Sequence, residues 1–107
     1  MITNNQAVKF ATSIGWDTDS HGFLIKKSDS GDSSITIRFT DNDNLQERVI
    51  YEAKKFDSDK FAIDLWERHE GRLSIEDCMQ IAQMFESDLI VLSRWLVRRE
   101  YMIKRFF

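Results

Sequence analysis

The feature of this sequence that most constrains its fold is a long apolar seam in its second half. From residue 75 to residue 96, hydrophobic residues recur at alternating steps of three and four, the spacing of one face of an amphipathic helix. The seam consists of Ile75, Cys78, Ala82, Phe85, Leu89, Leu92 and Leu96. Glu86, Ser87 and Asp88 interrupt the helix formers, so the pattern allows one bent helix of about 30 residues or two helices joined by a tight turn.

Two shorter helices are expected before the seam. Thr3 and Gln6 have the spacing of a capping box, and Ala7, Phe10, Ala11 and Ile14 follow as one apolar stripe. A second helix begins at Asp57 or Ser58, where Phe56 and Phe61 have the spacing of a hydrophobic staple. Its inner stripe is predicted to contain Phe61, Ala62, Leu65, Trp66 and His69.

The region between these helices has strand character. Three runs are predicted as strands, at residues 23–27, 35–40 and 46–54, and the last two alternate in the period-2 pattern. The turn-rich connections are short, as expected between antiparallel neighbours. We therefore expect one α+β domain spanning residues 1–107. It has an N-terminal helix, a three-stranded antiparallel β-meander and two or three C-terminal helices packed on one sheet face.

The chain carries no sequence motif of an enzyme, and we expect neither catalytic residues nor a cofactor. Its one cysteine, Cys78, lies on the apolar seam and is expected to be a small buried hydrophobe. The loops at residues 17–22 and 41–46 resemble the start of a calcium loop but depart from its later positions, so no metal site is expected. No apolar run is long enough to span a membrane, and the composition suits a cytoplasmic protein.

Charge is divided unevenly along the chain. Residues 1–93 hold 17 acidic and 10 basic residues, whereas residues 94–107 hold one acid and five bases. The acidic side chains in the predicted second helix and on the preceding turn form a candidate surface for binding a protein partner. These residues are Asp41, Asp43, Asp57, Asp59, Asp64, Glu67 and Glu70. Carboxylates held on a rigid helix can imitate a row of phosphates and occupy a basic nucleic-acid channel.

The basic end supports an alternative interpretation as a small helix-turn-helix DNA-binding regulator. Ala82, Leu92 and Trp95 match the apolar spacing of that motif, with a recognition helix beginning near Asp88. Phosphate contacts would come from Arg94, Arg98, Arg99, Lys104 and Arg105. Against this interpretation, Leu89, Ile90 and Val91 would face the bases without hydrogen-bonding groups. The negative charge of the rest of the chain would also repel DNA.

The chain end suggests a third interpretation, a self-associating structural protein. Tyr101, Ile103, Phe106 and Phe107 are apolar or aromatic residues among basic ones in a terminal segment. Terminal residues fray unless something holds them. We expect these side chains to enter the core or to form a homodimer interface.

The segment from Phe56 to Leu96 also carries a resemblance. Its opening Phe56-Asp57-Ser58-Asp59, then Leu65-Trp66-Glu67 and Ser74-Ile75-Glu76-Asp77, look like small accessory proteins of phages and mobile elements. The small acidic α+β build resembles several anti-CRISPR proteins. The resemblance implies a non-enzymatic anti-defence inhibitor that binds a host CRISPR nuclease complex in the bacterial cytoplasm by protein–protein occlusion. It assigns no functional residue.

Overall fold

The computed structural model describes residues 2–106, and of Phe106 only the backbone. The elements, in chain order, are α1 (Asn4–Ser13), β1 (Asp17–Thr18), β2 (Leu24–Lys27), β3 (Ser34–Ile37), α2 (Leu45–Lys55), α3 (Ser58–Arg68) and α4 (Ile75–Phe106). The α+β prediction is confirmed, because an N-terminal helix, a three-stranded antiparallel sheet and then helices follow one another. Three helices follow the sheet.

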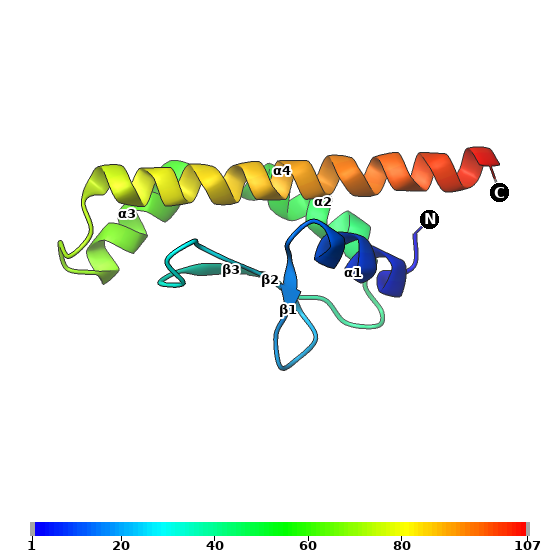
Figure 1. Cartoon of the computed structure of the whole chain (residues 1–107), viewed down its shortest axis with the longest axis horizontal. Helices are drawn as coiled ribbons and strands as arrows, with labels where there is room; N and C mark the ends of the chain where they lie inside the picture. The colour runs from blue at the N-terminus through cyan, green and yellow to red at the C-terminus, as the bar shows by residue number, and fades with distance from the viewer. Residues whose placement is uncertain (1, 107) are drawn as a thin grey trace.

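Helix α4 determines the length of the molecule. Its 32 residues extend about 48 Å at 1.5 Å per residue, close to the longest molecular dimension of 52 Å. Figure 1 shows α4 running the length of the molecule along one edge, with α1 and the sheet beneath it. Of the two alternatives that the sequence allowed, the single helix is correct. Phe85 and Leu89, on either side of the polar interruption, are both buried, so the seam keeps its phase through residues 86–88.

The strand predicted over residues 46–54 is wrong, because this segment forms helix α2. Leu45, Val49 and Ala53 are spaced by four residues and lie on one helix face, which packs into the core. The Asn44 side chain caps the helix by accepting a hydrogen bond from the Glu47 backbone N–H at 2.9 Å. The apolar residues of the 46–54 segment thus fit the 3.6-residue period of a helix as well as the two-residue period of a strand. The cap at Asn44 favours the helix.

The third strand of the sheet comes instead from residues predicted to be a polar loop. In the order β1-β2-β3, β1 pairs antiparallel with β2 and β2 pairs antiparallel with β3. Leu24 and Ile37 are directly opposite each other in the register, and both are buried. The predicted strand at 35–40 is found, but it is shorter, at residues 34–37. The short sheet therefore presents one apolar patch to the helices.

The start of α1 follows the predicted capping box. The Thr3 hydroxyl accepts a hydrogen bond from the Gln6 backbone N–H, and the Gln6 side chain accepts one from the Thr3 N–H. After the helix, Gly15 takes a positive φ of 102° that directs the chain into β1 and buries Trp16. The Gly15 carbonyl also accepts a hydrogen bond from the Lys26 ammonium at 3.2 Å, which ties α1 to β2.

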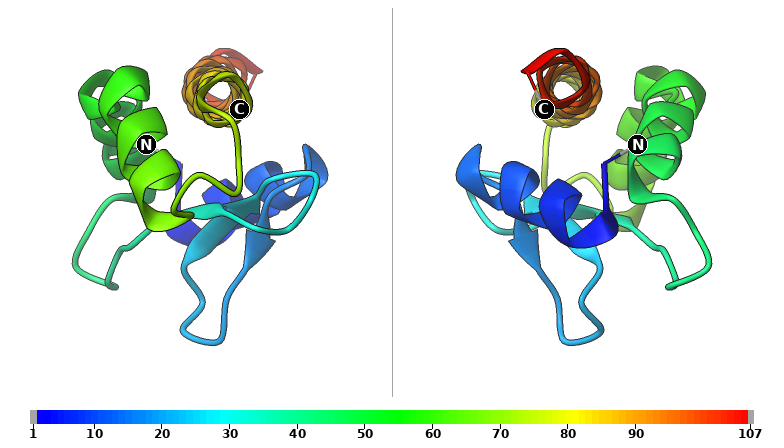
Figure 2. Two further views of the ribbon diagram at one scale, coloured as in Figure 1. Left: turned by 90° about the vertical axis from the view of Figure 1, so that its left-hand side faces the viewer. Right: turned by 90° about the vertical axis from the view of Figure 1, so that its right-hand side faces the viewer.

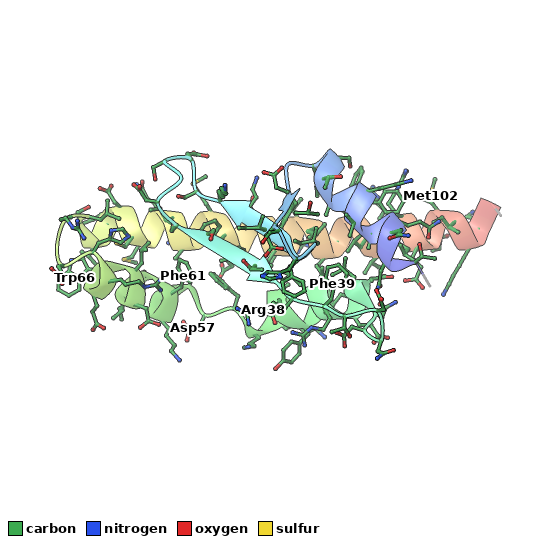
Figure 3. All side chains as sticks on the ribbon, turned by 90° about the horizontal axis from the view of Figure 1, so that it is seen from below. Arg38, Phe39, Asp57, Phe61, Trp66 and Met102 are labelled. Atoms are coloured by element: carbon green, nitrogen blue, oxygen red, sulfur yellow. The ribbon has the colours of Figure 1, made fainter. Side chains whose placement is uncertain are left out.

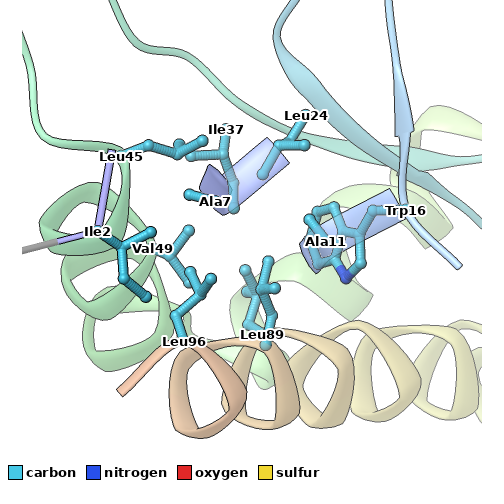
Figure 4. Packing of buried hydrophobic residues seen from close by; sticks show 11 residues of the cluster. Ile2, Ala7, Ala11, Trp16, Leu24, Ile37, Leu45, Val49, Leu89 and Leu96 are labelled. Carbon is cyan, nitrogen blue, oxygen red and sulfur yellow. The ribbon is translucent and has the colours of Figure 1, made fainter. Parts of the chain in front are cut away.

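Two apolar clusters form the core, and α4 contributes to both. The larger cluster joins α1, the sheet, α2 and α4 around Leu89, Leu92 and Leu96, as Figure 4 shows. The smaller cluster consists of Ala62 and Leu65 from α3 with Cys78 and Ala82 from α4. In the end-on views of Figure 2, α2 and α3 lie beside α4, whereas α1 and the sheet lie beneath α4. The buried seam therefore holds the two sides together.

One polar contact crosses the core between α2 and α4. Gln46, only 4% exposed, donates a side-chain hydrogen bond to the Glu100 carboxylate, which also accepts from Lys104 at 3.0 Å. The hydrogen bonds from Lys104 and Gln46 hold the pKa of the Glu100 carboxyl below its ordinary value. The ionised carboxylate therefore stabilises the folded chain.

Replacing Glu100 with alanine is expected to lower the free energy of unfolding by about 1–3 kcal/mol at pH 7, because the buried Gln46 amide loses its acceptor. The pKa of Glu100 is lower in the folded state, so this stabilisation is present above the unfolded-state pKa and is lost as the pH falls through the folded-state value. Urea denaturation of wild type and Glu100→Ala from pH 7 downward measures the difference. The matched control is Glu52→Ala, which removes an outer ion pair with Arg48 and is expected to cost about 0.5 kcal/mol or less. Equal losses in the two variants would contradict a special role for Glu100.

Candidate partner-binding surfaces

Helix α3 is held rigidly at both its start and its inner face. The Asp57 carboxylate caps the helix by accepting a hydrogen bond from the Lys60 backbone N–H at 3.1 Å. The Phe56 and Phe61 rings lie 5.4 Å apart, as expected for the predicted staple, and Phe61 meets Phe85 of α4 edge-on at 5.5 Å. These contacts fix the direction in which the outer side of α3 points.

The outer side of α3 and the turn that follows it present four exposed carboxylates. They belong to Asp59, Asp64, Glu67 and Glu70. Asp64 and Glu67 are three residues apart, so they are neighbours on the helix surface. No ion pair within 4 Å joins any of the four carboxylates to a basic side chain in residues 2–106. We call this group, together with Ile63 and Trp66 described next, the α3 acidic face.

Two large apolar side chains lie among these carboxylates. Trp66 is 42% exposed and Ile63 is 49% exposed. The prediction that Trp66 belongs to the inner stripe of the helix is wrong, because Ala62 and Leu65 occupy the centre of the buried face and Trp66 is displaced from Leu65 by about 100°. Figure 3 shows Trp66 near the end of the molecule where α3 ends, and Asp57 near the start of the same helix. The acidic face therefore contains an aromatic side chain that sequence reasoning placed in the core.

The other two predicted acidic contacts lie elsewhere. Asp41 and Asp43 are exposed on the loop between β3 and α2, close to α1, while α3 lies toward the opposite end of the molecule (Figure 1). The Asp43 carboxylate accepts hydrogen bonds from the Thr40 N–H at 2.7 Å and the Thr40 hydroxyl at 3.2 Å, so it closes the local turn. The structure places these two residues apart from the α3 carboxylates, so the seven predicted acids lie in two separate regions.

The basic cluster lies on the C-terminal part of α4, from residue 94 onward. Arg94, Arg98, Arg99, Lys104 and Arg105 are all exposed. The Arg99 guanidinium lies over the Phe10 ring, 4.7 Å from its centroid, and Lys104 pairs with Glu100. The helix-turn-helix geometry is a wrong prediction, because residues 86–88 lie inside a continuous helix and no turn separates two helices there.

The residues predicted for self-association have different environments. Tyr101 is 59% exposed, whereas Ile103 is half-buried and packs against the larger core cluster of its own chain. Only part of the Ile103 side chain is therefore exposed for contact with a second copy of the chain. The side chain of Phe106 and the whole of Phe107 lie outside the described residues. Figure 1 shows the last turns of α4 extending beyond the other elements.

Sequence reasoning also missed a cleft between the β2–β3 hairpin and the first half of α4. Its volume is about 370 Å³. Apolar side chains from α4 and the preceding loop line it, together with Lys26 and Lys27 of β2 and four aspartates: Asp29, Asp32, Asp77 and Asp88. Burial raises the pKa of the half-buried Asp88 carboxyl, and the nearby Asp29 raises it further, against the opposing effect of Lys26. We call this site the hairpin cleft.

The remaining reactive groups have structural environments. Cys78 is fully buried, as predicted, and burial raises the pKa of its thiol. The Asp19 carboxylate accepts hydrogen bonds from the backbone N–H groups of His21 and Phe23, both at 2.9 Å, which closes that loop as a turn. Within residues 2–106 no three histidine, cysteine or acidic side chains converge as a metal site. Over the same residues no helix has the length and apolarity needed to span a membrane.

No protein-family model, no curated protein and no solved structure matches the chain.

The half-buried Asp88 is expected to make stability depend on pH. The pKa of Asp88 is raised in the folded state, so its ionisation lowers the free energy of unfolding at a pH above the folded-state pKa. Below the unfolded-state pKa of about 3.9, the carboxyl is protonated in both states and this loss of stability disappears. Asp88→Asn is therefore expected to be more stable than wild type at pH 7, and this gain should vanish toward pH 3.5. Chemical denaturation across that range measures the difference. A gain that is constant with pH would contradict this cause.

Proposed function

We propose that this protein is a non-enzymatic binding protein, an inhibitor of the anti-CRISPR type that blocks a host nuclease complex through the α3 acidic face. The observation that carries the proposal is the combination of four exposed carboxylates, three on α3 and Glu70 just after it, with the half-exposed Trp66 and Ile63 of the same rigid helix. The resemblance of residues 56–96 to phage and mobile-element accessory proteins supports the class of partner. On this proposal the protein acts in the cytoplasm of a bacterial host cell.

The two kinds of side chain on this face have different roles in binding. Tryptophan is enriched among the residues that dominate binding energy, and burying Trp66 and Ile63 against a partner would anchor the complex. Carboxylates around such an anchor produce a negative electrostatic potential. This potential speeds the encounter with a basic partner surface and disfavours binding to acidic surfaces. A nuclease channel that holds a nucleic-acid backbone is basic in this sense.

The rigidity of α3 supports the proposal further. The staple at Phe56 and Phe61, the cap at Asp57 and the packing of Ala62 and Leu65 against α4 fix the helix before any partner arrives. A preformed surface loses little conformational entropy on binding. Residues 1–93, which include α3, carry seven more acids than bases, so this part of the chain produces a negative field around the face.

The double charge reversal Asp64→Lys/Glu67→Lys tests the proposal. Inhibition of DNA cleavage is measured for a panel of purified CRISPR nuclease–guide complexes, and the wild-type protein is expected to inhibit at least one. The reversed variant should need a concentration about tenfold higher or more, which corresponds to about 1.4 kcal/mol of lost binding.

The matched control is Asp17→Lys/Glu47→Lys, which makes the same change in net charge on β1 and α2, away from α3. It is expected to inhibit like the wild type, and thermal melting verifies that both variants fold. Three results would contradict the proposal: no inhibition of any complex, equal inhibition by the reversed variant, or equal loss in the control. Salt-sensitive binding to bare duplex DNA would favour the basic end of α4 as the functional surface instead.

A further inference from the structure

The hairpin cleft is a second candidate binding site, on the other side of α4 from the α3 acidic face. Figure 2 shows the turn of the β2–β3 hairpin and α3 on opposite sides of α4. The volume of about 370 Å³ lies in the range of small-ligand sites. The cleft extends along α4 from Asp77 to Asp88, eleven residues or about 16 Å. It is therefore elongated and open enough for a short stretch of polypeptide.

The floor of the cleft is apolar. Leu73, Ile81, Met84 and Phe85 contribute to its lining. Phe85 is fully buried, Leu73 and Ile81 are half-buried, and Met84 is 48% exposed. Methionine adapts its shape to a bound group better than branched side chains do. A ligand in this cleft would thus be in contact with apolar surface along much of its length.

The charged groups of the cleft favour a cation. Four aspartates face two lysines in the lining, which leaves an excess of two negative charges. The ammonium of Lys26 already donates to the Gly15 carbonyl at 3.2 Å. The Asp88 carboxylate makes no hydrogen bond and no ion pair within 4 Å in residues 2–106, although it is half-buried. A carboxylate in such a position gains more from a cationic partner than one in open solvent.

We infer that the hairpin cleft binds a basic segment of a partner polypeptide, anchored by an arginine side chain on Asp88. Arginine suits this cleft better than lysine, because its planar guanidinium is weakly hydrated, packs on flat apolar surface and reaches a carboxylate with two donors. The aliphatic part of the side chain lies along Ile81 and Met84. A second basic residue four positions away in an extended segment points to the same face and lies about 13 Å along the cleft, at 3.3 Å per residue, so its long side chain can reach toward Asp77. This inference goes beyond the proposed function, since it concerns another surface.

The test uses the peptide acetyl-Arg-Ala-Leu-Ala-Arg-amide and the same peptide with both arginines replaced by citrulline, which has the same shape but no charge. The full chain is labelled with ¹⁵N, and amide resonances are followed during titration. The arginine peptide is expected to shift resonances of residues 26–32 and 77–88. The citrulline peptide is expected to bind about tenfold more weakly or not at all, because it lacks the charge.

Two single variants locate the site. Asp88→Asn removes the anchoring charge without removing a packed side chain, and it is expected to weaken peptide binding about tenfold. Asp64→Asn makes the same charge change on the α3 acidic face and is expected to bind the peptide like the wild type. Shifts confined to α3, equal binding of both peptides, no binding, or equal effects of the two variants would each overturn the inference. No nuclease is present, so failure here leaves the result of the inhibition assay unaffected.

Discussion

The burial of one face of α4 is the constraint on which the rest of the structure depends. Cys78 and Ala82 complete the smaller core cluster with α3, while Leu89, Leu92 and Leu96 complete the larger one with α1, the sheet and α2. Neither a three-stranded sheet with strands of two to four residues nor a helix of ten or eleven residues is stable alone in water. Each becomes stable by covering part of the seam, so the helix organises the whole chain.

This arrangement places two different surfaces on either side of the first half of α4. The α3 acidic face contains Trp66 and exposed carboxylates, and the hairpin cleft contains an apolar floor with Asp88 at one end. The basic residues lie on the C-terminal part of the same helix, at the other end of a molecule 52 Å long from the α3 acidic face. A rigid scaffold with separated charge favours recognition of a partner by shape and potential.

Much of the fold could be predicted from local patterns, because caps and apolar spacing act over a few residues. The capping box at Thr3, the cap at Asp57 and the seam from Cys78 to Leu96 are all found. The segment at 46–54 could not be assigned by alternation, since its apolar residues fit both a strand and a helix. The candidate sites were less predictable: the exposure of Trp66 and the hairpin cleft depend on which tertiary neighbours cover each side chain, and local spacing does not encode that.

Whether α4 is one continuous helix through residues 86–88 is measured most directly by amide hydrogen exchange together with Cα chemical shifts. If the helix is continuous, these three residues have helical shifts. Their amides are then protected nearly as well as those around Ala82 and Leu92, because opening them requires opening the core. Non-helical shifts and rapid exchange confined to residues 86–88 would show two helices, and would remove the scaffold that holds both surfaces in place.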